Sequence, residues 1–141
     1  MKKIVLLSLL CFVLISFFAS VTLEQKANAA TRGDKTELEG KWVLQGSNMT
    51  FVFSEEKYEI TAQNVWYKGT FSIKTSTDPK EIDLVIEDTA MAQFKGQTSL
   101  GIYAFKEGIL FLAMNRPGAD QRPTQFQPGG DIQVFMLKKS E

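Results

Sequence analysis

Histidine is absent from this chain of 141 residues, and cysteine occurs once, at Cys11. Histidine is the side chain that most often carries protons in catalysis near neutral pH, and it completes the usual serine and cysteine nucleophile sites. Histidine and cysteine are also the main ligands of zinc, and a single cysteine cannot form an internal disulfide. The sequence therefore predicts no catalytic residues, no metal site and no cofactor. We do not expect an enzyme.

An excess of charge of either sign is lacking as well. Sixteen basic and sixteen acidic residues give a formal net charge of +0. Such a balance offers no attraction to the phosphates of a nucleic acid or to an anionic membrane surface. We therefore expect neither as a partner of the mature chain.

The N-terminal residues, in contrast, carry a clear pattern. Lys2 and Lys3 precede an almost uninterrupted apolar run over residues 4–20, and Ala27-Asn28-Ala29 forms a small-x-small cleavage site. A basic start, an apolar segment and a site of small residues, in this order, are typical of a secretory signal peptide. We predict that residues 1–29 are this signal and are cleaved off.

Cleavage after Ala29 would have two consequences. It would remove Cys11 with the signal, and it would place the mature chain in the medium or in the cell envelope. The alternative is an uncleaved anchor, because the apolar run reaches about twenty residues by Leu23, which is enough to span a bilayer.

The chain beyond the signal is long enough for one small domain. Residues 30–37 are small and polar and are expected to form a flexible leader, whereas residues 38–139 are expected to form the domain. Short runs rich in β-branched and aromatic residues recur there between Gly, Pro, Asn, Asp and Ser, and helical periodicity is lacking. Eight strands are predicted, at residues 40–46, 49–54, 57–63, 66–74, 81–87, 98–105, 109–115 and 132–138.

The predicted strands alternate between apolar and polar residues. Ile82, Leu84 and Ile86, for example, share one face of their strand. This period of two with one polar face is typical of an antiparallel sheet. Residues 109–114 are apolar on both faces, which indicates a central strand or one whose outer face is covered. Eight short strands predict an all-β fold, an antiparallel up-and-down β-barrel, because closure removes exposed edges; a two-sheet sandwich is the alternative.

The links between the predicted strands are of two kinds. Lys106-Glu107-Gly108 is expected to form a three-residue hairpin with a bulge, in which glycine takes the left-handed position. Residues 88–97 and 115–131 are too long for simple hairpins, and loops of this length are often functional. One interpretation of the first loop is that Met91 and Phe94 hold a lid or short helix over one end of the barrel.

A family resemblance follows from four motifs. Gly40-Lys41-Trp42 on the first strand resembles the G-x-W signature of lipocalins. It is followed in order by Pro79-Lys80-Glu81-Ile82-Asp83, Gly101-Ile102-Tyr103 and Arg122-Pro123-Thr124-Gln125-Phe126. The whole pattern resembles a family of small, uncharacterised, lipocalin-like bacterial domains that often occur in exported proteins, and it covers residues 38–139. The resemblance implies a lipocalin-like barrel and no established biochemical activity.

Aromatic side chains on the predicted strands are candidates for a ligand pocket. An eight-stranded barrel either fills with side chains or holds one small ligand. The candidate ring residues are Trp42, Phe53, Tyr67, Phe71 and Tyr103. For the tryptophan the resemblance implies instead a plug across the closed end of the barrel. A cation could then stack on its face, supplied by Lys138, Lys139, Arg116 or Arg122.

Two arginines in the second long loop are candidates for binding an anion. Arg116 and Arg122 carry guanidinium groups, whose geometry suits a carboxylate or a phosphate at the barrel mouth. The alternative is that they pair with nearby acids, such as Asp120, Asp131 or Asp83, and hold the loop in place.

These observations lead to two functional hypotheses. The first is a secreted, monomeric, non-enzymatic protein that holds a small apolar or amphipathic ligand in its barrel, with an entrance framed by residues 88–97 and 115–131. The second is an extracellular protein-interaction or inhibitor module whose barrel is filled and whose two long loops contact the partner. An empty interior would favour the first hypothesis.

Overall fold

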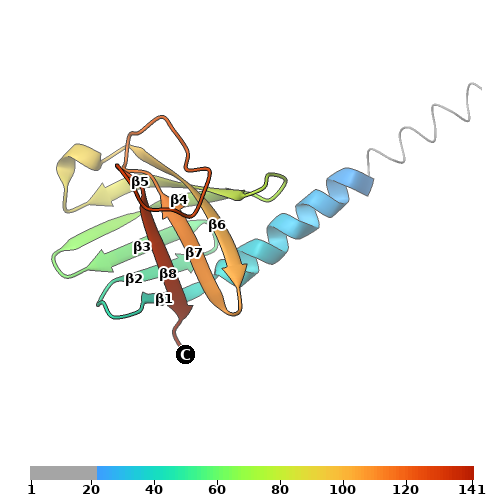
Figure 1. Ribbon diagram of the computed structural model, residues 1–141, viewed down its shortest axis with the longest axis horizontal. Helices are drawn as coiled ribbons and strands as arrows, with labels where there is room; N and C mark the ends of the chain where they lie inside the picture. Colours follow the sequence, from blue (N-terminus) through green and yellow to red (C-terminus); the bar gives the residue numbers. More distant parts are fainter. Residues whose placement is uncertain (1–21) are drawn as a thin grey trace, which may run out of the picture.

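Eight antiparallel strands close into one barrel in chain order (Figure 1). The computed structural model describes residues 22–141, so most of the predicted signal peptide, Cys11 included, lies outside the described residues. The strands are β1 Gly40–Leu44, β2 Thr50–Ser54, β3 Lys57–Ala62, β4 Val65–Lys74, β5 Lys80–Thr89, β6 Thr98–Lys106, β7 Ile109–Met114 and β8 Gln133–Lys139. Their bounds lie within two residues of those predicted, and the all-β, up-and-down barrel prediction is confirmed.

Closure occurs between the first and last strands. Trp42 on β1 lies opposite Phe51 on β2 and opposite Lys139 on β8. Both edges of β1 are therefore paired, and the same holds around the ring, so that no sheet edge remains for a second sheet. The two-sheet sandwich considered as the alternative is excluded.

The β6–β7 hairpin differs from its prediction. Lys106 pairs directly with Ile109, so the link contains only Glu107 and Gly108 and has no bulge. Both linking residues have positive φ, 53° and 76°. Positive φ at both central positions matches a two-residue turn whose twist fits that of the flanking strands. The prediction of a three-residue link with a bulge was therefore wrong, because the link has two residues. Its glycine does occupy a left-handed position, as expected.

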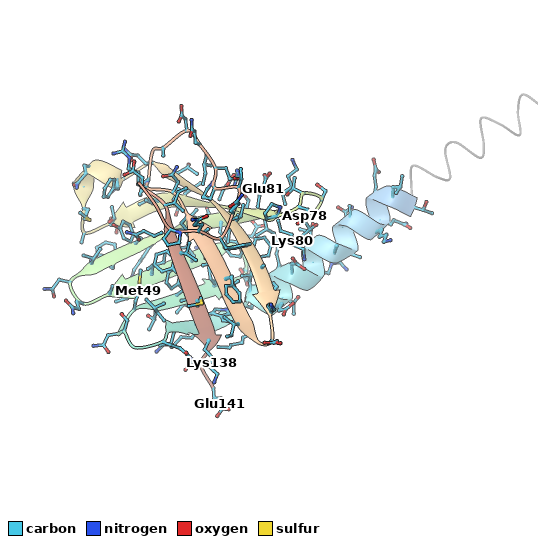
Figure 2. All side chains as sticks on the ribbon, in the orientation of Figure 1. Met49, Asp78, Lys80, Glu81, Lys138 and Glu141 are labelled. Atoms are coloured by element: carbon cyan, nitrogen blue, oxygen red, sulfur yellow. The ribbon has the colours of Figure 1, made fainter. Side chains whose placement is uncertain are left out.

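The strand links divide the barrel into two ends. One end carries the β2–β3, β4–β5 and β6–β7 links together with the N-terminal helix. The other end carries the remaining links, including the two long loops. Figure 2 shows the division: Asp78 and Lys80 lie near the helix, whereas Met49 lies at the far side of the barrel. We call these the helix end and the open end.

A helix covers residues 22–38, where the sequence led us to expect a flexible leader over 30–37. Polar contacts fix its last turns on the barrel: Asp34 Oδ2 accepts from Tyr103 Oη and from Lys80 Nζ, each at 2.6 Å. Leu38 is fully buried. The helix escaped the sequence analysis because these contacts are polar and leave no apolar periodicity. Within residues 22–141, no helix is both long and apolar enough to cross a membrane.

The half of the barrel next to the helix is filled with side chains. Trp42, Phe53, Phe71 and Leu137 are all buried there, and the rings of Phe53 and Phe71 meet edge to face at 5.1 Å. Edge-to-face contact is a favourable geometry for aromatic pairs and adds to the hydrophobic gain of burial. This end of the barrel is a packed core.

The outer face of β6 and β7 is covered by the loop that follows β7. Ile102 and Ala113 pair on this outer face and are both buried. Pro123 of the loop is buried as well, and the ring of Phe126 lies 6.4 Å from that of Phe111. Of the two explanations for a strand at 109–114 that is apolar on both faces, a central strand or a covered outer face, the covered outer face applies to this strand. In Figure 1 this loop arches across the barrel ahead of β8.

Candidate ligand-binding cavity

A cavity of about 250 Å³ occupies the open end of the barrel. Its mouth is formed by the ends of the long loops and of neighbouring strands. Its inner wall is mostly apolar, comprising Phe51, Tyr58, Ile60, Leu84, Ile86, Ser99, Met114 and Phe135. The filled helix end closes the bottom of the cavity, so a ligand can enter from one side only.

Tyr58 is the most distinctive residue of the wall. It lies opposite Gly69 on β4. The side chain is 4% exposed, and no hydrogen bond joins its hydroxyl to any of residues 22–141. Burial raises the pKa of Tyr58, and the negative charge of Glu87 and the neighbouring Tyr67 raise it further. The hydroxyl therefore keeps its proton and can donate it in a hydrogen bond.

Tyr67, a predicted site residue, lines the mouth of the cavity. Its hydroxyl donates to Met91 Sδ at 3.3 Å, and its ring lies 6.5 Å from that of Phe94. Phe94 ends a short 3-10 helix, η1 (Ala92–Phe94), which Figure 1 shows at the open end. Met91 and Phe94 thus hold a short helix at this end of the barrel, as the sequence suggested.

The second long loop is anchored to the cavity wall at its start. Ser99 Oγ donates to the carbonyl of Asn115 at 2.5 Å, and Asn115 in turn donates to the carbonyl of Gln121 at 2.8 Å. Asn115 and Pro117 line the mouth. The ends of this loop therefore frame the entrance as expected, whereas its middle covers the outer wall.

Arg116 also lies at the mouth, where it is paired. Its Nε lies 3.1 Å from Asp131 Oδ2, and both side chains are largely exposed. An exposed pair of this kind contributes little to stability, about 0–1 kcal/mol. The pairing agrees with the alternative interpretation of this arginine, that it pairs with a nearby acid and holds the loop in place.

Arg122 lies away from the cavity, on the outer face of β5 and β6. Its Nη1 donates to the carbonyls of Gly101 at 2.7 Å and Ile82 at 3.3 Å. The same nitrogen lies 2.7 Å from Asp83 Oδ1, and Nε lies 3.6 Å from Glu81 Oε2. Because the Nη1 protons serve the carbonyls, charge attraction rather than a hydrogen bond holds Asp83 Oδ1, which is buried. The alternative interpretation, that Arg122 pairs with acids and holds the loop, again applies.

Three predicted ring residues belong to the filled end rather than to the cavity: Trp42, Phe53 and Phe71. Trp42 is 3% exposed, and its Nε1 donates to the carbonyl of Leu38 at 2.7 Å. Lys139 Nζ lies 5.3 Å above its ring. The tryptophan is thus a core plug with a cation on its face, and Lys139 is the one of the four candidate cations that stacks there.

Tyr103 is the last of the predicted site residues. Its ring is buried at the helix end, and its hydroxyl donates to Asp34. Burial raises the pKa of Tyr103, and the hydrogen bond and negative charge of Asp34 raise it further. Tyr103 and Lys80 border a second depression beside the helix. The structure therefore gives Tyr103 a role in attaching the helix.

Metal ligands do not gather anywhere in the described part of the chain. No group of three or more Cys, Asp or Glu side chains within residues 22–141 is arranged to hold a metal ion. Asp131 at the cavity mouth and Asp83 beneath the covering loop are paired with arginines.

Fold and site together define a closed eight-stranded antiparallel barrel with an apolar cavity open at one end. Comparison with protein-family models gave no match, and no similar protein was found among curated sequences or solved structures. The functional argument therefore depends on the residues of this chain.

Proposed function

We propose that this protein is a non-enzymatic carrier or sensor that binds one small apolar or amphipathic molecule in its barrel. The observation that carries the proposal is the cavity of about 250 Å³ at the open end of a barrel that is otherwise packed. An apolar protein cavity of ~150 Å³ is large enough to take up benzene. Typical sites for drug-sized ligands begin near ~300 Å³. A single ring or a short chain therefore fits the space.

The lipocalin-like resemblance supports the same proposal. The tryptophan of its G-x-W motif, Trp42, plugs the helix end, and the opposite end carries the cavity. The predicted signal peptide would direct such a carrier out of the cytoplasm, to the medium or the cell envelope. A chain without histidine has few means of turning over what it binds.

The protein-interaction alternative draws less support. It required a barrel filled with side chains, whereas the open end is hollow. It also required the second long loop as a contact surface. The middle of that loop instead covers β6 and β7, where Pro123 is buried.

The first experiment is native mass spectrometry on protein recovered from the envelope or medium of its own host. We expect an added mass that is lost on denaturation. A bare mass would not by itself exclude a ligand that exchanges rapidly, so the experiment is paired with a direct binding assay.

The binding assay measures the affinity for toluene, a single-ring apolar probe, by calorimetry and uses two matched variants. Ile86→Trp places a large ring inside the cavity, whereas Val85→Trp places the same ring on the adjacent outward-facing position. We expect Ile86→Trp to abolish probe binding and Val85→Trp to retain it. Equal binding to both variants, or no binding to the unaltered protein together with a bare native mass, would contradict the proposed function.

A further inference from the structure

The cavity wall contains three hydroxyl groups, which differ in whether each one already donates a hydrogen bond to another residue. Tyr67 donates to Met91 Sδ, and Ser99 donates to the carbonyl of Asn115. Tyr58 donates to no group within residues 22–141, although it is 4% exposed. Within the described residues, Asp83 Oδ1 is the one buried side-chain polar atom without a partner, so the Tyr58 hydroxyl is not sealed off but is open to the cavity that the residue lines. Among the three hydroxyls of the wall, that of Tyr58 is therefore the one open to an acceptor on a ligand.

The charged side chains that line the cavity itself are paired with each other. The charged residues that line it are Arg116 and Asp131, which pair at 3.1 Å at the mouth. The deeper wall is built from apolar side chains and hydroxyls. A charged ligand group buried there would lose its hydration without gaining a counter-charge, which is strongly unfavourable. The site therefore suits an uncharged molecule.

The donor stays available at physiological pH. Burial, the negative charge of Glu87 and the nearby Tyr67 all raise the pKa of Tyr58, so its hydroxyl is protonated. A phenolate at this position would have required a cationic or hydrogen-bond-donating ligand. The protonated form instead selects for an acceptor.

We propose that the ligand is an uncharged molecule with one apolar ring or short chain and a single carbonyl or ether oxygen that accepts a hydrogen bond from Tyr58. This inference rests on the proposed function, because it names the class of molecule that the same cavity takes. Aromatic ketones and neutral esters are members of this class, whereas fatty acids at neutral pH are not.

The test compares two probes of nearly the same shape. Acetophenone carries a carbonyl oxygen where α-methylstyrene carries a methylene group, and benzoate serves as the charged control. We measure the three affinities by calorimetry for the unaltered protein and for Tyr58→Phe. Loss of one hydrogen bond should reduce the preference for acetophenone over α-methylstyrene by about tenfold. Benzoate should bind more weakly than acetophenone to the unaltered protein.

Tyr103→Phe is the matched control, because it removes the hydroxyl of another buried tyrosine that does not line the cavity. It should leave the ratio of the two affinities unchanged. A second measurement needs no variant: the infrared carbonyl stretch of bound acetophenone should shift to lower wavenumber, as it does on accepting a hydrogen bond.

The outcomes separate this inference from the proposed function. If α-methylstyrene and acetophenone both bind but Tyr58→Phe leaves their ratio unchanged, or the carbonyl stretch does not shift, the ligand class is wrong and the binding function stands. Benzoate binding as tightly as acetophenone would also overturn the ligand class. If neither of the two neutral probes nor toluene binds, both proposals fail.

Discussion

At the scale of single residues, Trp42 illustrates how one side chain serves several contacts. Its ring is buried, its Nε1 donates to the carbonyl of Leu38, and Lys139 lies over its face. Trp42→Ala should lower the free energy of unfolding by about 3–5 kcal/mol, because a large cavity replaces the ring. Chemical denaturation measures the loss. The control is Trp66→Ala, which removes the half-buried tryptophan of β4 and should lower the free energy of unfolding clearly less. Equal losses of stability in the two variants would show that Trp42 is not a core plug.

Tyr103 gives a prediction about pH. Its pKa is raised in the folded protein by burial and by Asp34, whereas an unfolded tyrosine ionises near pH ~10. Because the folded state holds its proton longer, the stabilisation is complete below pH ~10 and is lost as the pH rises through and above that value. The slope is about 1.4 kcal/mol per pH unit.

The measurement is the free energy of unfolding between about pH 8 and about pH 11, a range that includes the ordinary tyrosine pKa of ~10. Tyr103→Phe should be less stable at the lower pH and should decline less steeply above pH ~10 than the unaltered protein. Subtracting the two curves removes the shared contribution of the lysines. Parallel curves would show that the pKa of Tyr103 is not raised in the folded protein.

The sequence predicted which residues point inward but not how deep each one lies. Alternation along the strands places Phe53 and Tyr58 on the inner face, and both are inside. Depth along the barrel depends on register with neighbouring strands, which a single strand does not reveal. Phe53 and Tyr58 even lie directly opposite each other on β2 and β3, yet Phe53 packs against Phe71 in the core whereas Tyr58 reaches the cavity. The unpaired hydroxyl of Tyr58 was therefore missed.

At the scale of elements, the β6–β7 turn leads to a prediction that separates steric clash from backbone conformation as the cause of a loss of stability. A side chain at Gly108 would meet nothing within 4 Å, but φ there is +76°. Gly108→Val should lower stability by about 1–2 kcal/mol because a left-handed conformation is unfavourable for a β-branched residue. Gly108→Asn should lose less, since asparagine tolerates this region. Thermal unfolding of both variants is the measurement, and equal stability of the valine variant would rule out the two-residue turn.

The elements themselves were predicted unevenly, for physical reasons. The strands were recognisable because each one buries alternate residues, which leaves a period of two in the sequence. The N-terminal helix was not, because Thr31, Asp34 and Lys35 attach it through polar contacts to Thr75, to Lys80 and Tyr103, and to Glu56. Polar docking leaves no apolar stripe to detect.

At the scale of the whole molecule, the barrel divides into a packed half and a hollow half. Rings fill the helix end, while the wall of the open end includes Ser99 and Ile86, whose side chains are smaller. Whether a barrel of this strand number is filled or hollow depends on the summed volume of each inward-facing layer. Layers follow from the register of all eight strands together, so the cavity could not be derived from the sequence alone.

The position of the helix contacts leads to a prediction about where the folded unit begins. The contacts that attach the helix to the barrel all come from residues 31–38. They are made by the side chains of Thr31, Asp34 and Lys35, by Leu38, and by the carbonyl of Glu37, which accepts from Lys139. Cleavage after Ala29 would preserve all of them. A chain of residues 30–141 should therefore unfold in one cooperative transition.

A chain of residues 39–141 would keep every strand but lose the buried Leu38 and the partner of Tyr103 and Lys80. It should be less stable than residues 30–141 by at least about 3 kcal/mol, from the cavity left by leucine and the unpaired polar groups. Denaturation of the two chains measures the difference, and Asp34→Ala in the longer chain should lie between them. Identical midpoints would mean that the helix does not stabilise the barrel, whereas a large difference would make it part of the barrel's closed end.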